Sequence, residues 1–150
     1  MKTKAIIECI RDYFKKCPYL TNFDINVDFL GSDGECFSIE EVPATIILKR
    51  FIDGSKEKQC LFVLASRTFI GTQENQQSIA NLHLFEKIAN WLENNTENDV
   101  LPTLNNKQTA TSIEALSSGY LFGTDSVKKY ARYQIQCQLK YFEEGIKWNN

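Results

Sequence analysis

The sequence predicts an α+β domain in which two helices pack on a mainly antiparallel sheet of about five to six strands. Residues 2–16 and 76–94 carry apolar side chains at spacings of three and four, which is typical of amphipathic helices. Strand-like runs joined by short turns fill most of the remaining chain, and adjacent hairpins favour antiparallel pairing. The expected order is α-β-β-β-β-α-β-β, within a single domain that spans residues 1–150.

The first half of the chain begins with the helix at residues 2–16, which ends before Pro18 because proline cannot continue a helix. Residues 25–29 then alternate between apolar and polar side chains, as in a half-buried strand. A glycine-rich turn follows at residues 31–34. We therefore expect residues 36–40 to be the second strand of a hairpin.

The strongest core signal comes from residues 45–52 and 60–69, which are rich in apolar, β-branched and aromatic side chains. Asp53 and Gly54 lie between these runs and are typical of a hairpin turn, in which glycine can take positive φ. We expect the two runs to be the central antiparallel strands of the sheet.

The second half of the chain begins with the helix at residues 76–94. Residues 109–116 alternate loosely and predict a short or edge strand, and residues 119–123 are expected to form an aromatic connector. The last strand has the clearest pattern in the chain, with one apolar face made by Tyr133, Ile135, Cys137, Leu139 and Tyr141. Its other face is polar and carries Gln134, Gln136, Gln138 and Lys140.

Composition limits the classes of function. The chain has 19 acidic and 17 basic residues, with a formal net charge of −2. A protein whose main partner is nucleic acid usually carries a basic excess, so we expect no specific nucleic-acid binding. No apolar run approaches the roughly 20 residues that span a membrane. We expect a protein that is made in the cytoplasm and stays soluble.

The cysteines and the histidine offer little chemistry. The 5 cysteines include no C-x-x-C pair, which is typical of small buried hydrophobic residues in a reducing compartment. His83 is the single histidine, and the cysteines lack the spacing of a structural zinc site. A Cys–His nucleophile pair stays formally open, but nothing selects one cysteine for it. We expect no enzyme, no metal and no cofactor, and we assign no role to His83.

Charge is unevenly distributed along the chain. The first sixteen residues and the segment from residue 128 onward have a basic excess, whereas the middle is acidic. Solvated surface explains this pattern, and so does a charge-complementary face that orients neighbouring copies. The polar face of the last strand is either an ordinary solvent-facing surface or a contact surface. As a contact surface it makes these residues candidates for a subunit interface: Lys128, Lys129, Arg132, Gln134, Gln136 and Gln138.

A series of short motifs runs from the second helix to the last strand. They are Asn81-x-x-x-Phe85-Glu86-x-Ile88-x-x-Trp91, Leu101-Pro102-x-Leu104, Ser112-Ile113-Glu114-Ala115, Gly119-Tyr120-Leu121-Phe122 and Ala131-Arg132-Tyr133-Gln134-Ile135-Gln136-Cys137. In this order, after the hairpin at Asp53 and Gly54, the series resembles phage tail-terminator or tail-completion proteins. These are encoded by siphophages and prophages of Gram-positive bacteria and are often grouped with minor capsid proteins. The likeness covers residues 46–142.

The resemblance implies a structural virion protein. Its copies would assemble in the host cytoplasm as a ring, commonly hexameric, on the head-proximal end of the tail tube. There the ring would end tube growth and join the tail to head-completion proteins at the head–tail junction. The resemblance supplies no catalytic residues. Two alternatives stay open, another head–tail connector component and a small acidic binding module of immunity or inhibitor type, which is expected to be a monomer.

Overall fold

The computed structural model describes residues 3–28, 36–69, 74–125 and 130–145. The fold is α+β, as the sequence predicts, with two helices and a seven-stranded, mixed but mostly antiparallel sheet. In chain order the elements are α1 (Ile6–Phe14), β1 (Ile25–Val27), β2 (Cys36–Val42), β3 (Ile47–Arg50), β4 (Lys56–Phe69), α2 (Glu74–Glu97), β5 (Gln108–Ala115), β6 (Tyr120–Asp125) and β7 (Tyr130–Glu143).

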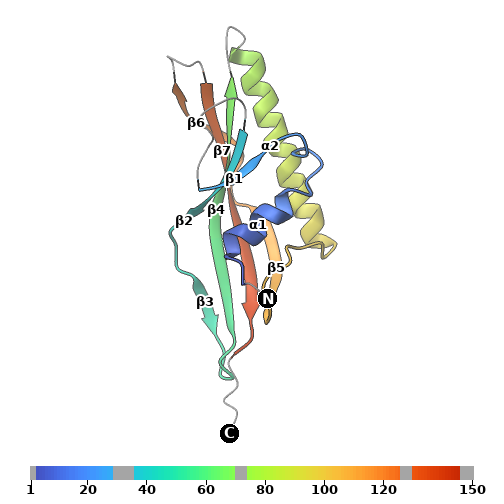
Figure 1. The fold of residues 1–150 in the computed structure, drawn as a ribbon, viewed down its shortest axis with the longest axis vertical. Coiled ribbons are helices and arrows are strands. Elements are labelled where there is room, and N and C mark those ends of the chain that lie inside the picture. The colour runs from blue at the N-terminus through green and yellow to red at the C-terminus, as the bar shows by residue number, and fades with distance from the viewer. Residues whose placement is uncertain (1–2, 29–35, 70–73, 126–129, 146–150) are drawn as a thin grey trace.

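The centre of the sheet is the antiparallel pair of β4 and β7. Each strand has 14 residues, and the pairing runs without a break from Lys56 opposite Glu143 to Phe69 opposite Tyr130. The strand order is β1-β2-β4-β7-β5, while β3 pairs with β4 and β6 pairs with β7. Figure 1 shows β4 and β7 running side by side along most of the length of the molecule.

Both helices cover the same face of β4. The ring of Phe62 packs edge-on against Phe14 of α1, with ring centroids 6.0 Å apart. On α2, Asn81 accepts a hydrogen bond of 2.9 Å from the Thr68 hydroxyl. Side chains two, four or six residues apart in a strand point to the same side, so Phe62 and Thr68 share one face. Neither described helix lies on the opposite face of β4, which we call the helix-free face.

The core lies between this covered face and the two helices. Its largest fully buried side chains are Phe14, Phe62, Phe85, Ile10, Leu20, Ile39, Leu64, Ile88, Leu92, Ile113, Ile135 and Leu139. The two helices also meet each other, because Tyr13 packs against Trp91 with ring centroids 5.0 Å apart. The Tyr13 hydroxyl donates to the Val100 carbonyl at 2.9 Å and accepts from the Asn95 amide at 2.9 Å. Burial raises the pKa of Tyr13, so its hydroxyl stays protonated.

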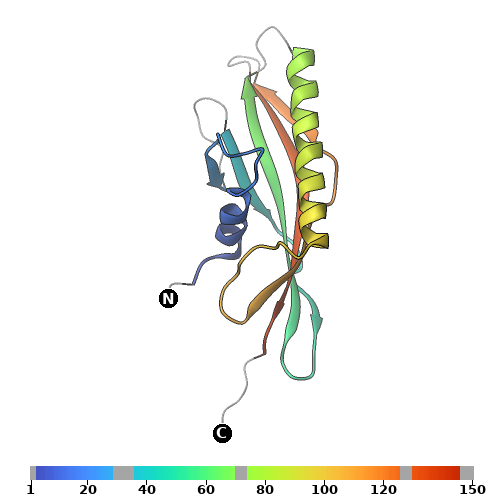
Figure 2. The same ribbon diagram turned by 90° about the vertical axis from the view of Figure 1, so that its right-hand side faces the viewer.

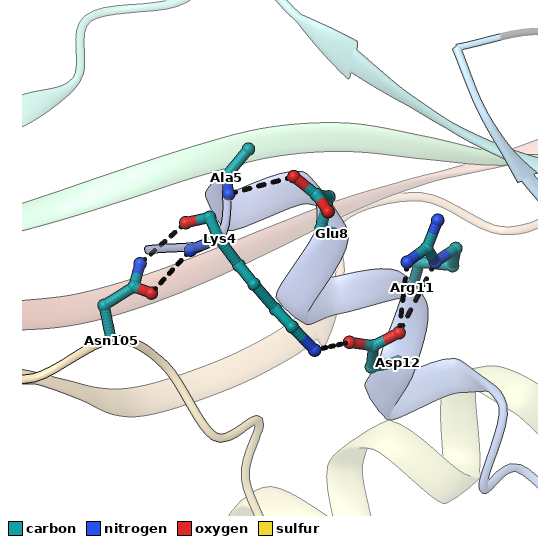
Figure 3. A network of polar contacts seen from close by, with 6 residues as sticks. All are labelled: Lys4, Ala5, Glu8, Arg11, Asp12 and Asn105. Atoms are coloured by element: carbon teal, nitrogen blue, oxygen red, sulfur yellow. Dashed lines mark hydrogen bonds and ion pairs between the residues drawn. The ribbon is translucent and has the colours of Figure 1, made fainter. Parts of the chain in front are cut away.

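A polar network fixes the start of α1 (Figure 3). The Asn105 side chain accepts from the Lys4 backbone N–H at 2.9 Å and donates to the Lys4 carbonyl at 2.7 Å, much as a neighbouring strand would. The Lys4 ammonium pairs with Asp12 at 2.7 Å, and the Glu8 carboxylate accepts from the Ala5 N–H at the first turn. These contacts attach the amino-terminal residues to the loop before β5.

The predicted hairpin of residues 25–29 with residues 36–40 is wrong. β1 and β2 are neighbours, but they run parallel, with Ile25 opposite Phe37 and Val27 opposite Ile39. Alternation of apolar and polar side chains shows which face of a strand is buried, but it is the same for parallel and antiparallel pairs. The sequence pattern therefore identifies the strands without giving their relative direction.

The predicted central position of residues 45–52 is also wrong. β3 pairs with the first residues of β4 only, from Ile47 opposite Lys58 to Arg50 opposite Lys56, and three of its four residues are exposed. The central partner of β4 is β7. An apolar run indicates burial, yet here it forms part of a hairpin that extends past the ends of both helices (Figure 2). We call this hairpin, residues 45–58, the β3–β4 arm.

Of the remaining strand predictions, one is wrong and two are confirmed. Residues 119–123 do not form a connector, since Tyr120–Asp125 is strand β6 and pairs with β7. β5 lies at the end of the strand order, which confirms the expected edge strand. The alternation of the last strand is confirmed, because every second side chain from Ala131 to Tyr141 is buried.

Gly119 permits a close approach between the start of β6 and α2, which gives a first test. A Cβ atom at this position would lie 2.6 Å from the Cβ of Phe85, which is fully buried. We expect Gly119→Ala to lower the free energy of unfolding by about 1–3 kcal/mol, as overpacking of a core does. Gly123→Ala is the matched control, since its Cβ would meet nothing within 4 Å. Urea unfolding measures both, and equal effects of the two substitutions would contradict the proposed packing.

Candidate interface on the helix-free face of the sheet

The predicted interface residues on β7 point to the helix-free face. Arg132, Gln134, Gln136 and Gln138 alternate with the buried residues of the strand. Gln136 is exposed and Gln138 is half-buried, but Gln134 is only 6% exposed. The other two predicted residues, Lys128 and Lys129, lie outside the described residues.

Neighbouring strands place further side chains beside these residues. On this face, Ala65 of β4 lies between Ser38 of β2 and Gln134 of β7. In the next row, Val63 lies between Glu40 and Gln136. The register therefore brings β2, β4 and β7 together at this site, although sequence reasoning selected residues from β7 alone.

An ion pair crosses the central strand here. The Arg132 guanidinium lies 3.1 Å from the Glu40 carboxylate, although the two strands are separated by β4. Arg132 is opposite Arg67 and Glu40 is opposite Val63, so the two side chains meet above Ala65, which lies between those positions. Ala65 is fully buried, and its methyl group leaves the space that the two long side chains occupy.

Hydrogen bonds extend this ion pair to the edge of the sheet. The Ser38 hydroxyl donates to Glu40 at 2.6 Å, and the Arg132 guanidinium donates to the Gln134 side-chain oxygen at 3.0 and 3.1 Å. The Gln134 amide donates to the Tyr120 hydroxyl of β6 at 2.6 Å. The partly buried polar groups of this face are thus satisfied by one another. Sequence reasoning missed Ser38, Glu40 and Tyr120, and the shared face of Ser38 and Glu40 was the available signal.

Electrostatics make this face polar with little net charge. Burial raises the pKa of Glu40, but hydrogen bonds from Arg132 and Ser38 outweigh it and hold the pKa below its ordinary value of 4.5. The carboxylate is therefore ionised at neutral pH and is neutralised by Arg132. The guanidinium also lies 5.0 Å from the ring centroid of Phe122, which is 62% exposed. The site is suited to binding a polar surface through hydrogen bonds and an aromatic contact.

Of the chemically reactive side chains, Cys36 shares the helix-free face with Ser38 and Glu40. All five cysteines are buried and none forms a disulfide, which confirms their predicted role as small hydrophobic residues. Burial raises the pKa of Cys60 to about 12, so its thiol is protonated and a weak nucleophile at neutral pH. His83 is exposed on α2, with its ring nitrogen 3.7 Å from the Glu86 carboxylate.

Within the described ranges, no three His, Cys, Asp or Glu side chains lie together as metal ligands would. Neither of the helices in this part of the chain combines the length and apolar composition that crossing a membrane requires.

Comparison with known proteins does not assign a family. No model of a known protein family matches this sequence, and a search of curated proteins finds no match. The resemblance to tail-terminator proteins therefore stays a prediction. A proposal on function has to rest on the geometry of this chain's own residues.

The ion pair above Ala65 predicts a pH-dependent effect of Arg132→Met. In the native protein the lowered pKa of Glu40 gives a stabilisation that is present above the ordinary carboxyl range and is lost as the pH falls through the lowered pKa. The variant keeps the burial but loses the guanidinium, so the pKa of Glu40 should rise. At pH 7 the free energy of unfolding should fall by about 1–3 kcal/mol, because a partly buried carboxylate loses its partner.

Titration of the Glu40 carboxyl carbon by NMR and urea unfolding at pH 7 and pH 4 measure these effects. Lys140→Met is the matched control, since Lys140 lies on the same face of β7 outside the network. An unchanged pKa of Glu40 in Arg132→Met would show that the guanidinium does not set it.

The small side chain at position 65 gives a separate prediction. Ala65→Leu should fill the space beneath the ion pair, force Arg132 and Glu40 apart, and raise the pKa of Glu40. Ala65→Ser adds one polar atom and should change this pKa far less. The same NMR titration measures both variants, and a Leu variant with the native pKa would contradict the crossing above Ala65.

Proposed function

We propose that this chain is a structural subunit of a phage tail, of the tail-terminator type. Copies assemble side by side into a ring on the head-proximal end of the tail tube, end its growth and offer a surface to a head-completion protein. The ring is commonly hexameric in the family that the sequence resembles. The protein acts through contacts between surfaces, with no catalytic step.

The observation that carries this proposal is the ordered polar network on the helix-free face. Arg132, Glu40 and Gln134 already hold one another in place, so binding does not have to order them. Fixing a free, long side chain on binding costs about 0.5–1.5 kcal/mol, and this cost is largely removed in advance. Exposed Gln136 donates to the Tyr120 hydroxyl at 3.3 Å and half-buried Gln138 donates to the Gln59 side-chain oxygen at 2.7 Å, and their remaining polar groups can bond to a partner directly or through water.

The shape of the sheet supports the same proposal. Because β4 and β7 pair over their full length, the sheet is long. Its two faces differ because only one is covered by helices. Copies that meet through two different surfaces form a heterologous contact, which closes into a ring when the rotation between copies allows it. A polar, nearly neutral contact surface suits such a wet interface between subunits that are made as separate soluble chains.

Sedimentation and tube-assembly measurements test the proposal. We expect the purified chain to form rings that negative-stain microscopy can image, and to shorten the tubes that tail-tube subunits form in its presence. Gln136→Arg/Gln138→Arg should reduce ring formation and lengthen the tubes, because it would bury two charges without partners at each contact. Thr21→Arg/Asn22→Arg adds the same charge at two exposed positions outside this face and should have no effect.

The alternative readings predict other results. A small binding module would be a monomer at all concentrations and would leave tube length unchanged. That outcome for the native chain would overturn the proposed function. Rings that form but do not limit tube growth would favour a different connector component of the head–tail junction.

A further inference from the structure

The β3–β4 arm exposes a group of large apolar side chains. Ile52 at the turn is fully exposed, and Ile46, Leu48 and Phe51 are 58%, 42% and 40% exposed. In Figure 2 the arm extends past the ends of α1 and α2, so neither helix covers these side chains. Clustered apolar exposure of this kind marks an interaction site in a soluble protein.

The arm holds these side chains in a defined arrangement. The Phe51 N–H donates to the Ser55 carbonyl at 2.9 Å, and the Gly54 N–H donates to the Phe51 carbonyl at 3.0 Å. At the base of the arm, Lys58 pairs with Glu143 of β7 at 2.8 Å. The Phe51 ring lies 6.1 Å from the ring of Phe142, which connects the turn to β7. The apolar group is therefore presented on an ordered hairpin.

The arm also carries a net positive charge, since its four basic residues outnumber Asp53 and Glu57, although Glu57 lies across the ladder from Lys49. Lys49 and Arg50 are exposed, and within the described ranges no carboxylate lies within ion-pair distance of either. The Lys49 ammonium lies 5.2 Å from the ring centroid of Phe51, so charge and apolar surface are adjacent. A partner that fits this arm would offer carboxylates beside an apolar side chain.

The carboxyl end of α2 has this chemistry. Glu93, Glu97 and Asp99 are exposed there, and Val100 next to them is 53% exposed. The last turn of α2 contains no basic residue. Carboxylates near the negative end of a helix dipole are unfavourable, so cations supplied from outside would stabilise this end.

The two surfaces lie apart within one copy. In Figure 1 strands β7 and β5 lie between the arm and the end of α2. We infer that the β3–β4 arm of one copy docks on the carboxyl end of α2 of a neighbouring copy. Lys49 then faces Glu93 and Glu97, and Phe51, which lies beside it, covers Val100, while Arg50 on the other side of the strand adds to the positive charge of the arm. Because each copy carries both surfaces, this contact is heterologous and can close a ring.

This inference rests on the proposed assembly into rings and adds a second pair of surfaces to the contact made through the helix-free face. Charge reversal tests it. Lys49→Glu/Arg50→Glu and Glu93→Lys/Glu97→Lys should each weaken self-association roughly tenfold or more, because like charges then face each other. An equimolar mixture of the two variants should associate again, since the reversed arm fits the reversed helix end and the two native surfaces fit each other.

Sedimentation velocity over a concentration series measures the effect. Lys15→Glu/Lys16→Glu is the matched control for the arm variant, because it makes the same change in net charge at two exposed adjacent lysines outside both surfaces. Ile52→Asp provides a second variant for the apolar part of the contact and should also weaken association. All substituted side chains are exposed, and circular dichroism checks that each variant is folded.

The outcomes separate this inference from the proposed function. If the native chain forms rings and both charge variants form them equally well, or the mixture fails to associate, the arm contact is wrong while the ring proposal stands. A native chain that stays monomeric and leaves tube length unchanged would overturn both.

Discussion

The structure depends on the unbroken pairing of β4 with β7. These two strands are far apart in the sequence, at residues 56–69 and 130–143, and their 14-residue ladder fixes the register of the strands on either side of them. One face of the ladder receives Phe14 and Asn81 from the two helices, and the other receives the Arg132–Glu40 ion pair. A slip of one residue would exchange these faces, burying glutamines in the core and exposing Ile135 and Leu139. Both the core and the candidate interface thus require the same register.

Much of this arrangement can be predicted from the sequence, because the local periodicity of apolar residues indicates which side of a helix or strand is buried. It predicts both helices, the alternation of β7 and therefore the polar row that includes Arg132. It does not predict Glu40 as a partner of Arg132, since the two are 92 residues apart and meet only through the register of three strands. It does not give the direction of β1 relative to β2, because alternation has no direction.

The error at residues 45–52 has a different cause. Hydrophobic composition reports that a segment avoids water, but it does not say whether a segment of the same chain provides the cover. In β3 and the adjoining turn, side chains that look like core residues are exposed, including Ile52. A strand that is too apolar for its place in the monomer is a useful indication that a surface is completed by another molecule. The sequence therefore carried this information, in a form that only the structure allows one to interpret.

The base of the arm is continuous with the centre of the sheet, since β4 enters the arm while still paired with β7 up to Lys56 and Glu143. No loop interrupts the strand between arm and body, so the arm has no hinge at this point. Antiparallel ladder bonds lie across the strand direction. A mechanical pull on the arm along β4 would therefore load many of these bonds together in shear.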